Sequence, residues 1–195
     1  MSCSGLFLGS SISCSDPLAV GIEQRLFLAN LEDVASFTFD GTETNMVTAI
    51  TMESGKKFFE FEGLKQSIST QSEYTPKPYS VGYKHTVDFS VFSVTAEQRR
   101  NLEAMAFQPT VAIAYGPNDS SLGNGAFEIL GINAGLEIVT NIRIPADNET
   151  GGAYRIQLAT PDAGGIETQL PSVFWTDPST GTYASALTAI EALKV

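Results

Sequence analysis

Residues 56–92 read KKFFEFEGLKQSISTQSEYTPKPYSVGYKHTVDFSVF, and the rest of the chain is interpreted around this stretch. Two runs rich in Phe, Val, Ile, Thr and Tyr flank a centre, YTPKP at 74–78, that contains two prolines. Phe, Val, Ile, Thr and Tyr favour β-strands, and proline favours turns. The stretch therefore predicts a long antiparallel hairpin or arm over 56–92.

The two halves of this hairpin differ in pattern. The second half alternates, with His85, Val87, Phe89 and Val91 on an apolar side and Thr86, Asp88 and Ser90 on a polar side. The first half, KQSISTQSE at 65–73, has one strongly apolar residue, Ile68, and is polar on both faces. Such a strand is weakly fixed in register unless something else holds it. A partner subunit is one candidate for that role, and an ordinary solvated hairpin is the alternative.

The composition is that of one folded domain of 195 residues. With 43% hydrophobic residues and 12 Phe there is enough apolar material for a β core, and a charged fraction of 17% argues against disorder. The formal net charge of −11 disfavours direct binding to nucleic-acid phosphates, which need Lys and Arg as counter-charges.

The sequence predicts neither a membrane segment nor an export signal. The first residues, MSCSGLFLGSSISC, have no basic region and no long apolar run, and no apolar run approaches the roughly 20 residues that span a bilayer. We expect a soluble protein made in the cytoplasm. Cys3 and Cys14 are expected to be reduced thiols, with a disulfide between them as the alternative.

Outside the hairpin the chain predicts further strands and two helices. Residues 1–20 are expected to form an N-terminal arm, and 176–195 a C-terminal segment with a short helix over 183–193. Residues 31–39 fit either a short helix or a strand. Strands are predicted at 21–30, 45–52, 110–115, 126–131, 136–144 and 153–159. The fold class that follows is a single mainly-β domain over 1–195, a sandwich or barrel with a long hairpin arm and one packed α-helix.

That packed helix is predicted at 95–107. Thr95 and Gln98 have the spacing of a capping box, in which side chains satisfy the exposed amides of the first turn. Helical periodicity places Leu102, Met105 and Phe107 toward the core and Arg99, Arg100 and Glu103 toward solvent.

The sequence contains no recognisable catalytic, metal or cofactor site. The one histidine, His85, lies on the apolar side of a strand, where a packed and hydrogen-bonded ring is a simpler interpretation than a catalytic base. There is no GxSxG motif, no set of ligands with zinc-site spacing and no GxxxxGK[ST] loop. We therefore expect neither enzymatic activity nor a cofactor, with a hydrolase of unrecognised site as the alternative.

The order of these features resembles the tail tube proteins of long-tailed bacteriophages, relatives in fold of the inner-tube proteins of contractile injection machines. The resemblance covers residues 21–174. It rests on the hairpin at 56–92, the helix at 95–107, the strand at 110–115 and the segment GAFEILGINAGLEIVTNIRIPADNETGGAYRIQLATPDAGGIETQLPSVF at 125–174. The two cysteines of the N-terminal arm depart from it, because the family gives them no role.

The resemblance implies a structural protein of the virion tail. Its partners would be further copies of itself, other tail proteins and viral DNA that passes through without specific binding. Six subunits would form a ring with a continuous inner β-barrel, and rings would stack through the hairpin and the terminal arms into an open filament. An acidic channel wall without Lys and Arg to bind the phosphates would let DNA slide through.

The resemblance also assigns residues to these surfaces. The lumen-facing residues are expected to be Glu60, Glu62, Thr86, Asp88 and Ser90. The ring-to-ring contacts at the hairpin tip are expected to be Tyr74, Thr75, Lys77 and Tyr79.

Two other functions stay open. A tail terminator, neck ring or baseplate ring would have a similar fold but would close instead of elongating. A β-sandwich binding module would recognise carbohydrate or protein through Trp175, Tyr115 and the loop at 116–125. For the residues assigned to the lumen and to the hairpin tip, the alternative is that they are simply exposed to solvent.

Overall fold

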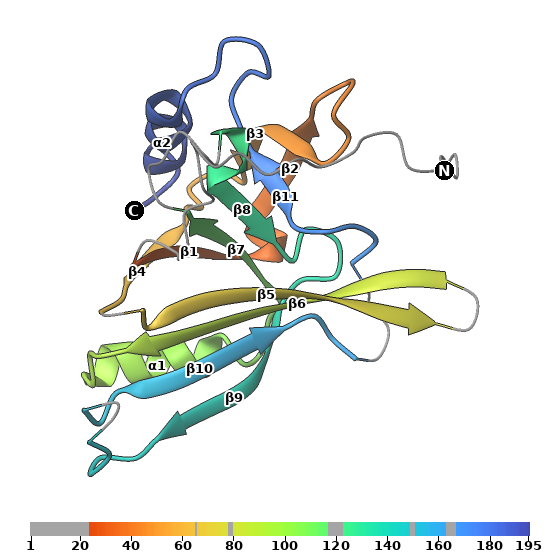
Figure 1. Cartoon of the computed structure of the whole chain (residues 1–195). Coiled ribbons are helices and arrows are strands. Elements are labelled where there is room, and N and C mark those ends of the chain that lie inside the picture. The colour runs from red at the N-terminus through yellow and green to blue at the C-terminus, as the bar shows by residue number, and fades with distance from the viewer. Residues whose placement is uncertain (1–23, 65, 78–79, 117–122, 149–150, 163–166) are drawn as a thin grey trace, which may run out of the picture.

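The protein is built from two β-sheets that pack face to face, with a helix beside each (Figure 1). The computed structural model describes residues 24–64, 66–77, 80–116, 123–148, 151–162 and 167–195. The predicted mainly-β class, with a hairpin arm and a packed helix, is confirmed.

The seven-stranded sheet has the order β2-β3-β11-β8-β7-β1-β4. Its paired strands are antiparallel except that β11 runs parallel to β3, and β11 alone joins the β2–β3 hairpin to the other strands. The strands are β1 (Arg25–Asn30), β2 (Val34–Phe39), β3 (Met46–Met52), β4 (Phe59–Glu62), β7 (Thr110–Tyr115), β8 (Phe127–Leu130) and β11 (Ser172–Phe174).

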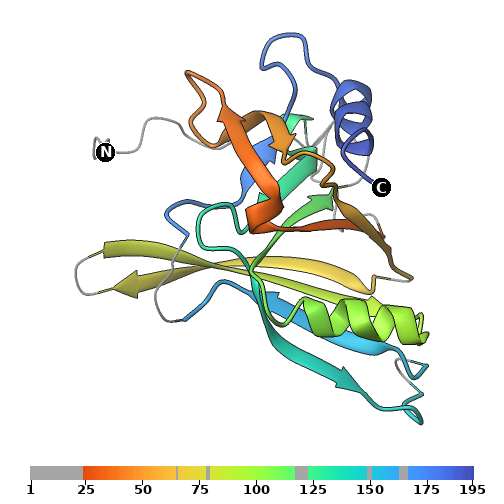
Figure 2. The ribbon, with the colours of Figure 1, turned by 180° about the vertical axis from the view of Figure 1, so that it is seen from behind.

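The four-stranded sheet has the order β5-β6-β10-β9, with every pair antiparallel. Its strands are β5 (Ile68–Lys77), β6 (Ser80–Val91), β9 (Glu137–Arg143) and β10 (Tyr154–Ala159). β5 and β6 form a long hairpin whose far end extends well beyond the rest of the sheet (Figures 1 and 2).

The central strands of the seven-stranded sheet are buried on both faces, which explains why their sequences do not alternate. On β7, Val111, Ile113 and Tyr115 belong to one core and Ala112 and Ala114 to the other, and none is more than 2% exposed. A strand covered on both sides is expected to be an unbroken apolar run, as TVAIAY is.

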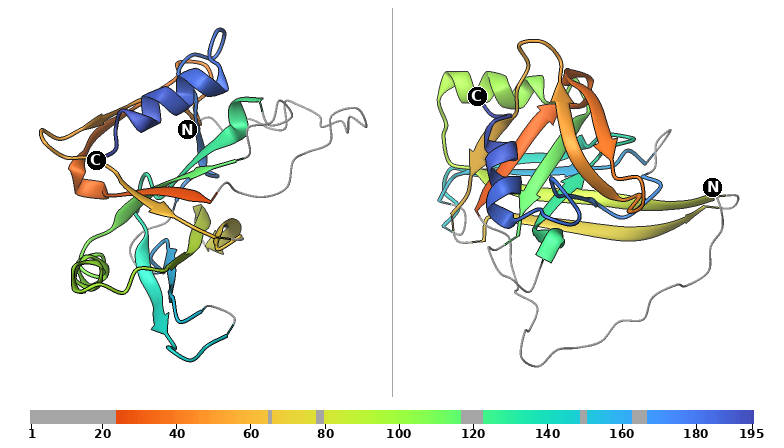
Figure 3. Two further views of the ribbon diagram at one scale, coloured as in Figure 1. Left: turned by 90° about the vertical axis from the view of Figure 1, so that its left-hand side faces the viewer. Right: turned by 90° about the horizontal axis from the view of Figure 1, so that it is seen from above.

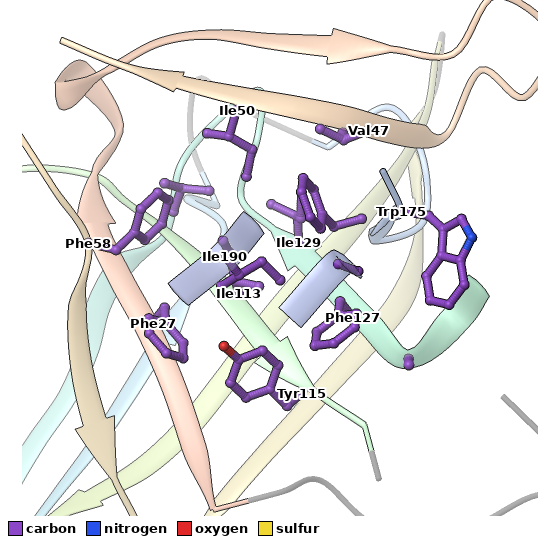
Figure 4. Close-up of a cluster of buried hydrophobic side chains, with 14 of the residues drawn as sticks. Phe27, Val47, Ile50, Phe58, Ile113, Tyr115, Phe127, Ile129, Trp175 and Ile190 are labelled. Atoms are coloured by element: carbon purple, nitrogen blue, oxygen red, sulfur yellow. The ribbon is translucent and has the colours of Figure 1, made fainter. Parts of the chain in front are cut away.

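The first core lies between the seven-stranded sheet and α2 (Tyr183–Glu191) (Figure 4). The Tyr115 ring meets the rings of Phe27 and Phe127 edge to face, with centroids 5.0 Å apart in each pair. Such pairs add to the stabilisation from burial alone. Ile190 of α2 completes the cluster, so the helix covers the face of the sheet that looks away from the four-stranded sheet.

The second core lies between the two sheets and extends under α1 (Ala96–Ala104). Leu102 and Met105 come from the α1 region, and the Thr95 hydroxyl caps the helix by accepting a hydrogen bond from the Gln98 amide at 3.2 Å. The prediction that Phe107 faces the core is wrong. The helix ends before it, and Phe107 is 83% exposed.

The hairpin is shorter than the predicted 56–92, because it begins at Ile68. Gln66 has a φ of 62°, a left-handed conformation that interrupts an extended strand. The chain before this turn forms β4, which leaves the hairpin and pairs with β1 at the edge of the other sheet. The ambiguous residues 31–39 divide into a 3-10 turn, Leu31–Asp33, and strand β2.

Candidate functional site

The four-stranded sheet has one face on the core and one face open. Val87 and Phe89 of β6 point into the core between the sheets, so Thr86, Asp88 and Ser90 point away from it and are half-buried. The structure thus brings three of the five predicted lumen-facing residues together on one polar surface, which we call the outer face.

The outer face is hollowed by a pocket of 640 Å³ between β6, β10 and β9. Asp88, Arg155 and Gln157 line it, and Gln157 Nε2 donates a hydrogen bond to Asp88 Oδ1 at 2.9 Å. Arg155 forms no ion pair within the described part of the chain. The hollow therefore carries both signs of charge, although the sequence suggested an acidic surface.

Both outer strands of the four-stranded sheet have an unpaired side in the described structure. β5 pairs with β6 alone and β9 with β10 alone. β9 exposes the apolar side chains of Val139 and Ile142, which are 58% and 52% exposed. An unpaired edge presents free N–H and C=O groups to any strand that approaches.

The hairpin tip holds the residues predicted for ring-to-ring contact. Tyr74 is 55% exposed and packs edge to face on Tyr83 across the ladder, with ring centroids 6.0 Å apart. Thr75 is opposite Gly82, and Lys77, the last residue of β5, is opposite Ser80. Tyr79 lies outside the described residues. The far end of the hairpin projects from the body in the right-hand view of Figure 3.

Glu60 and Glu62 are not on the outer face, because β4 belongs to the other sheet. Glu60 joins a closed set of ion pairs in which Arg25 and Lys194 each contact Glu60 and Glu191. Burial raises the pKa of Glu60, but the hydrogen bonds from Arg25 and Lys194 outweigh it, so the net pKa lies below its usual value. Glu60 therefore ties β4 to β1 and to the end of α2.

His85 is packed and hydrogen-bonded, as predicted, and is 2% exposed. Its Nδ1 accepts from the Gly131 amide at 3.4 Å, which assigns the proton to Nε2, and Nε2 donates to the Gln169 carbonyl at 3.1 Å. Burial lowers the pKa of His85 below its ordinary value, against the opposing effect of the Glu167 charge. The ring is a structural contact between β6, the turn after β8 and the segment before β11.

Glu167 is a buried carboxylate that the sequence did not single out. It is 1% exposed and accepts hydrogen bonds from the Asn133 amide at 3.1 Å, the Ala134 amide at 3.0 Å and Asn133 Nδ2 at 2.9 Å. These donors satisfy the buried charge. Glu167 lies in a polar loop with no periodicity, so no sequence pattern indicated its burial.

The described residues also bear on a metal site, a membrane helix and the residues of a binding module. Within the described residues, no group of His, Cys, Asp and Glu could hold a metal ion, and no helix is long and apolar enough to cross a membrane. Trp175 and Tyr115 are buried in the first core, so neither offers an exposed ring to a carbohydrate. Cys3, Cys14 and most of the loop at 116–125 lie outside the described residues.

Comparisons with protein-family models, curated proteins and solved structures found no match to this chain. The function is therefore argued from the sheet itself.

Proposed function

We propose that the chain is a structural subunit of a bacteriophage tail tube, whose copies join into rings that stack around a channel for the genome. The observation that carries this proposal is the four-stranded sheet, which within the described residues is covered on one face only and ends in two unpaired strands. Such a sheet is completed by pairing with neighbouring copies.

The direction of the edge strands supports pairing between copies. Since β5, β6, β10 and β9 alternate in direction, β5 and β9 run opposite to each other. A neighbour's β5 laid beside β9 therefore continues the antiparallel order without a break. A contact between two different edges is heterologous, and it closes into a ring when the rotation between copies allows.

In such a ring the outer face becomes the wall of the channel. Each copy contributes Thr86, Asp88 and Ser90 from β6 and the Asp88–Gln157 hydrogen bond between β6 and β10. Arg155 adds one cation per copy to this wall. The net charge of −11 opposes phosphate binding, so DNA is expected to pass instead of adhering. The projecting hairpin tip is the element proposed to reach the next ring.

A substitution on the β9 edge tests this proposal. Val139→Asp places a carboxylate where strand pairing would remove it from water, so we expect a folded subunit that no longer forms tubes or rings in negative-stain images. Phe39→Asp is the matched control, because Phe39 is an exposed apolar residue on β2, at an edge of the other sheet. If Phe39→Asp loses its tubes while Val139→Asp forms normal tubes, β5 and β9 are not the edges that join the copies.

The same images separate the tube from a terminator, neck or baseplate ring. Tubes support the elongating subunit, and single rings that never stack support the closing one. Monomers at all concentrations would contradict both.

A further inference from the structure

A second pocket opens between the two sheets, beside the unpaired edge of β5. It has a volume of 380 Å³ and lies on the inner side of the four-stranded sheet, opposite to the outer face. Thr70 and Ser72 of β5 line one side, Glu128 of β8 lies across from them, and Leu170 and Pro171 form an apolar wall.

Glu128 occupies a position between the sheets that other strands fill with apolar residues. On β8, Phe127 and Ile129 belong to the first core, so Glu128 and Leu130 point toward the four-stranded sheet. The Glu128 carboxylate accepts a 3.4 Å hydrogen bond from the Thr70 hydroxyl, and no cation contacts it within the described residues. Burial raises the pKa of Glu128 above its usual value.

The pocket also contains a hydroxyl without a partner. Ser72 Oγ is buried and forms no hydrogen bond within the described residues. Unpaired buried acceptors are unfavourable, so a ligand that donates hydrogen bonds would be stabilised here. The polar side chains that line the pocket are the Glu128 carboxylate, the Thr70 and Ser72 hydroxyls and the amides of Asn45 and Gln71. An apolar wall lies beside them.

This set matches a guanidinium group. Arginine presents five N–H donors in a planar fork, which pairs bidentately with a carboxylate and leaves donors for neighbouring hydroxyls. Its flat face and aliphatic stem pack against apolar side chains such as Leu170 and Pro171. A metal ion fits less well, because Glu128 is the single charged group among the residues that line the pocket.

The chain itself carries an exposed arginine pair. Arg99 and Arg100 lie on the solvent side of α1 and form no ion pair within the described residues. Unpaired adjacent cations are notable in a chain with 11 Lys and Arg against 22 Asp and Glu. Such a pair attracts a partner surface with an unpaired carboxylate.

α1 and the Glu128 pocket lie on the same side of the four-stranded sheet. α1 lies along the inner side of the four-stranded sheet, near β10 and β9 (Figures 1 and 2). The Glu128 pocket is also on the inner side, at β5. If β9 of one copy pairs with β5 of the next as proposed, α1 of the first copy and the pocket of the second lie on the same side of the joined sheet.

We propose that the Glu128 pocket binds an arginine of a second copy of this chain, supplied by the Arg99–Arg100 pair. The contact rests on the proposed function, because it joins the same two subunits that β5 and β9 join. The contact places an arginine against Glu128 at each boundary between subunits. This ion pair fixes the register in which a neighbouring strand pairs with the polar edge strand β5.

Charge exchange tests this contact directly. Variant X carries Glu128→Arg and variant Y carries Arg99→Glu and Arg100→Glu. Each variant alone places like charges at every boundary, so we expect folded subunits whose assembly is lost in sedimentation and negative-stain images. A 1:1 mixture restores opposite charges at every X–Y boundary, so we expect rings or tubes that contain both variants in alternation.

Three further variants control for fold and for charge. Glu128→Gln removes the charge while keeping the shape, so we expect weaker assembly from a subunit that unfolds at a higher temperature at pH 7. Glu103→Gln and Lys57→Glu change exposed charges that belong neither to the pocket lining nor to the Arg99–Arg100 pair, and they are expected to assemble like the wild type.

The outcomes separate the two proposals. Wild-type tubes together with normal assembly of X and Y alone would overturn the arginine contact and leave the tube proposal standing, and so would loss of assembly in X and Y that their mixture does not restore. A wild-type chain that stays monomeric would overturn both. Assembly of the X–Y mixture, with no assembly of X or Y by itself, supports the contact.

Discussion

At the scale of single residues, His85 couples folding to pH. Its pKa lies below that of the unfolded chain, so as pH falls below about 6.5 the unfolded state takes up a proton before the native state does. The stabilising effect is complete above that pH and is lost progressively toward the lower, native pKa.

We therefore expect the free energy of unfolding to decrease between pH 7.5 and 5.5, by at most about 1.4 kcal/mol per pH unit for one proton. Urea unfolding at several pH values measures this. Because the chain has one histidine, His85→Gln should flatten the dependence in this range. An unchanged slope in that variant would assign the proton to another group.

The sequence pattern predicted the position of a side chain correctly where burial on one face of a strand determines the residue type. The alternation of β6 predicted the buried side of Val87 and Phe89, the outward side of Asp88, and the packing of His85. Glu60 was misplaced because its role depends on Arg25 and Lys194, which are distant in sequence and near only after folding. Arg155 and Glu128 gave no local signal for the same reason.

At the scale of elements, the strands were predictable and their sheet membership was not. β3, β7 and β10 lie within their predicted ranges, because their apolar patterns are long and regular. Assigning β4 to the hairpin failed, because Gly63, which directly follows β4, was not interpreted as the start of a turn. Partners of a strand are chosen by tertiary packing, which a local pattern does not contain.

The hairpin can lose its tip without losing its ladder. Deletion of residues 74–79 leaves the pairing of Ile68–Glu73 with Lys84–Phe89, including the buried contacts of Ile68 and Phe89. We expect a folded subunit that still forms single rings but does not stack, with an unfolding temperature within a few degrees of the wild type. Negative-stain images and thermal unfolding measure the two properties. If the deletion variant forms long tubes, the hairpin tip does not make the ring-to-ring contact.

At the scale of the whole molecule, the charge of −11 opposes assembly of identical copies. Salt screens this repulsion, since the Debye length falls from about 30 Å at 0.01 M to about 3 Å at 1 M. We expect tube formation to increase with NaCl over this range, measured by sedimentation at fixed protein concentration. Tubes that dissolve as salt is added would show that exposed attractive pairs dominate over the net charge.

The position of β11 has a consequence for the timing of synthesis. β2 and β3 leave the ribosome early, but β3 reaches the rest of its sheet only through β11, at Ser172–Phe174. At about 5–20 residues per second, the early hairpin waits on the order of ten seconds for that strand. Nascent chains therefore cannot complete the seven-stranded sheet before this point. If the proposed function holds, only copies whose translation has passed it can join a tube.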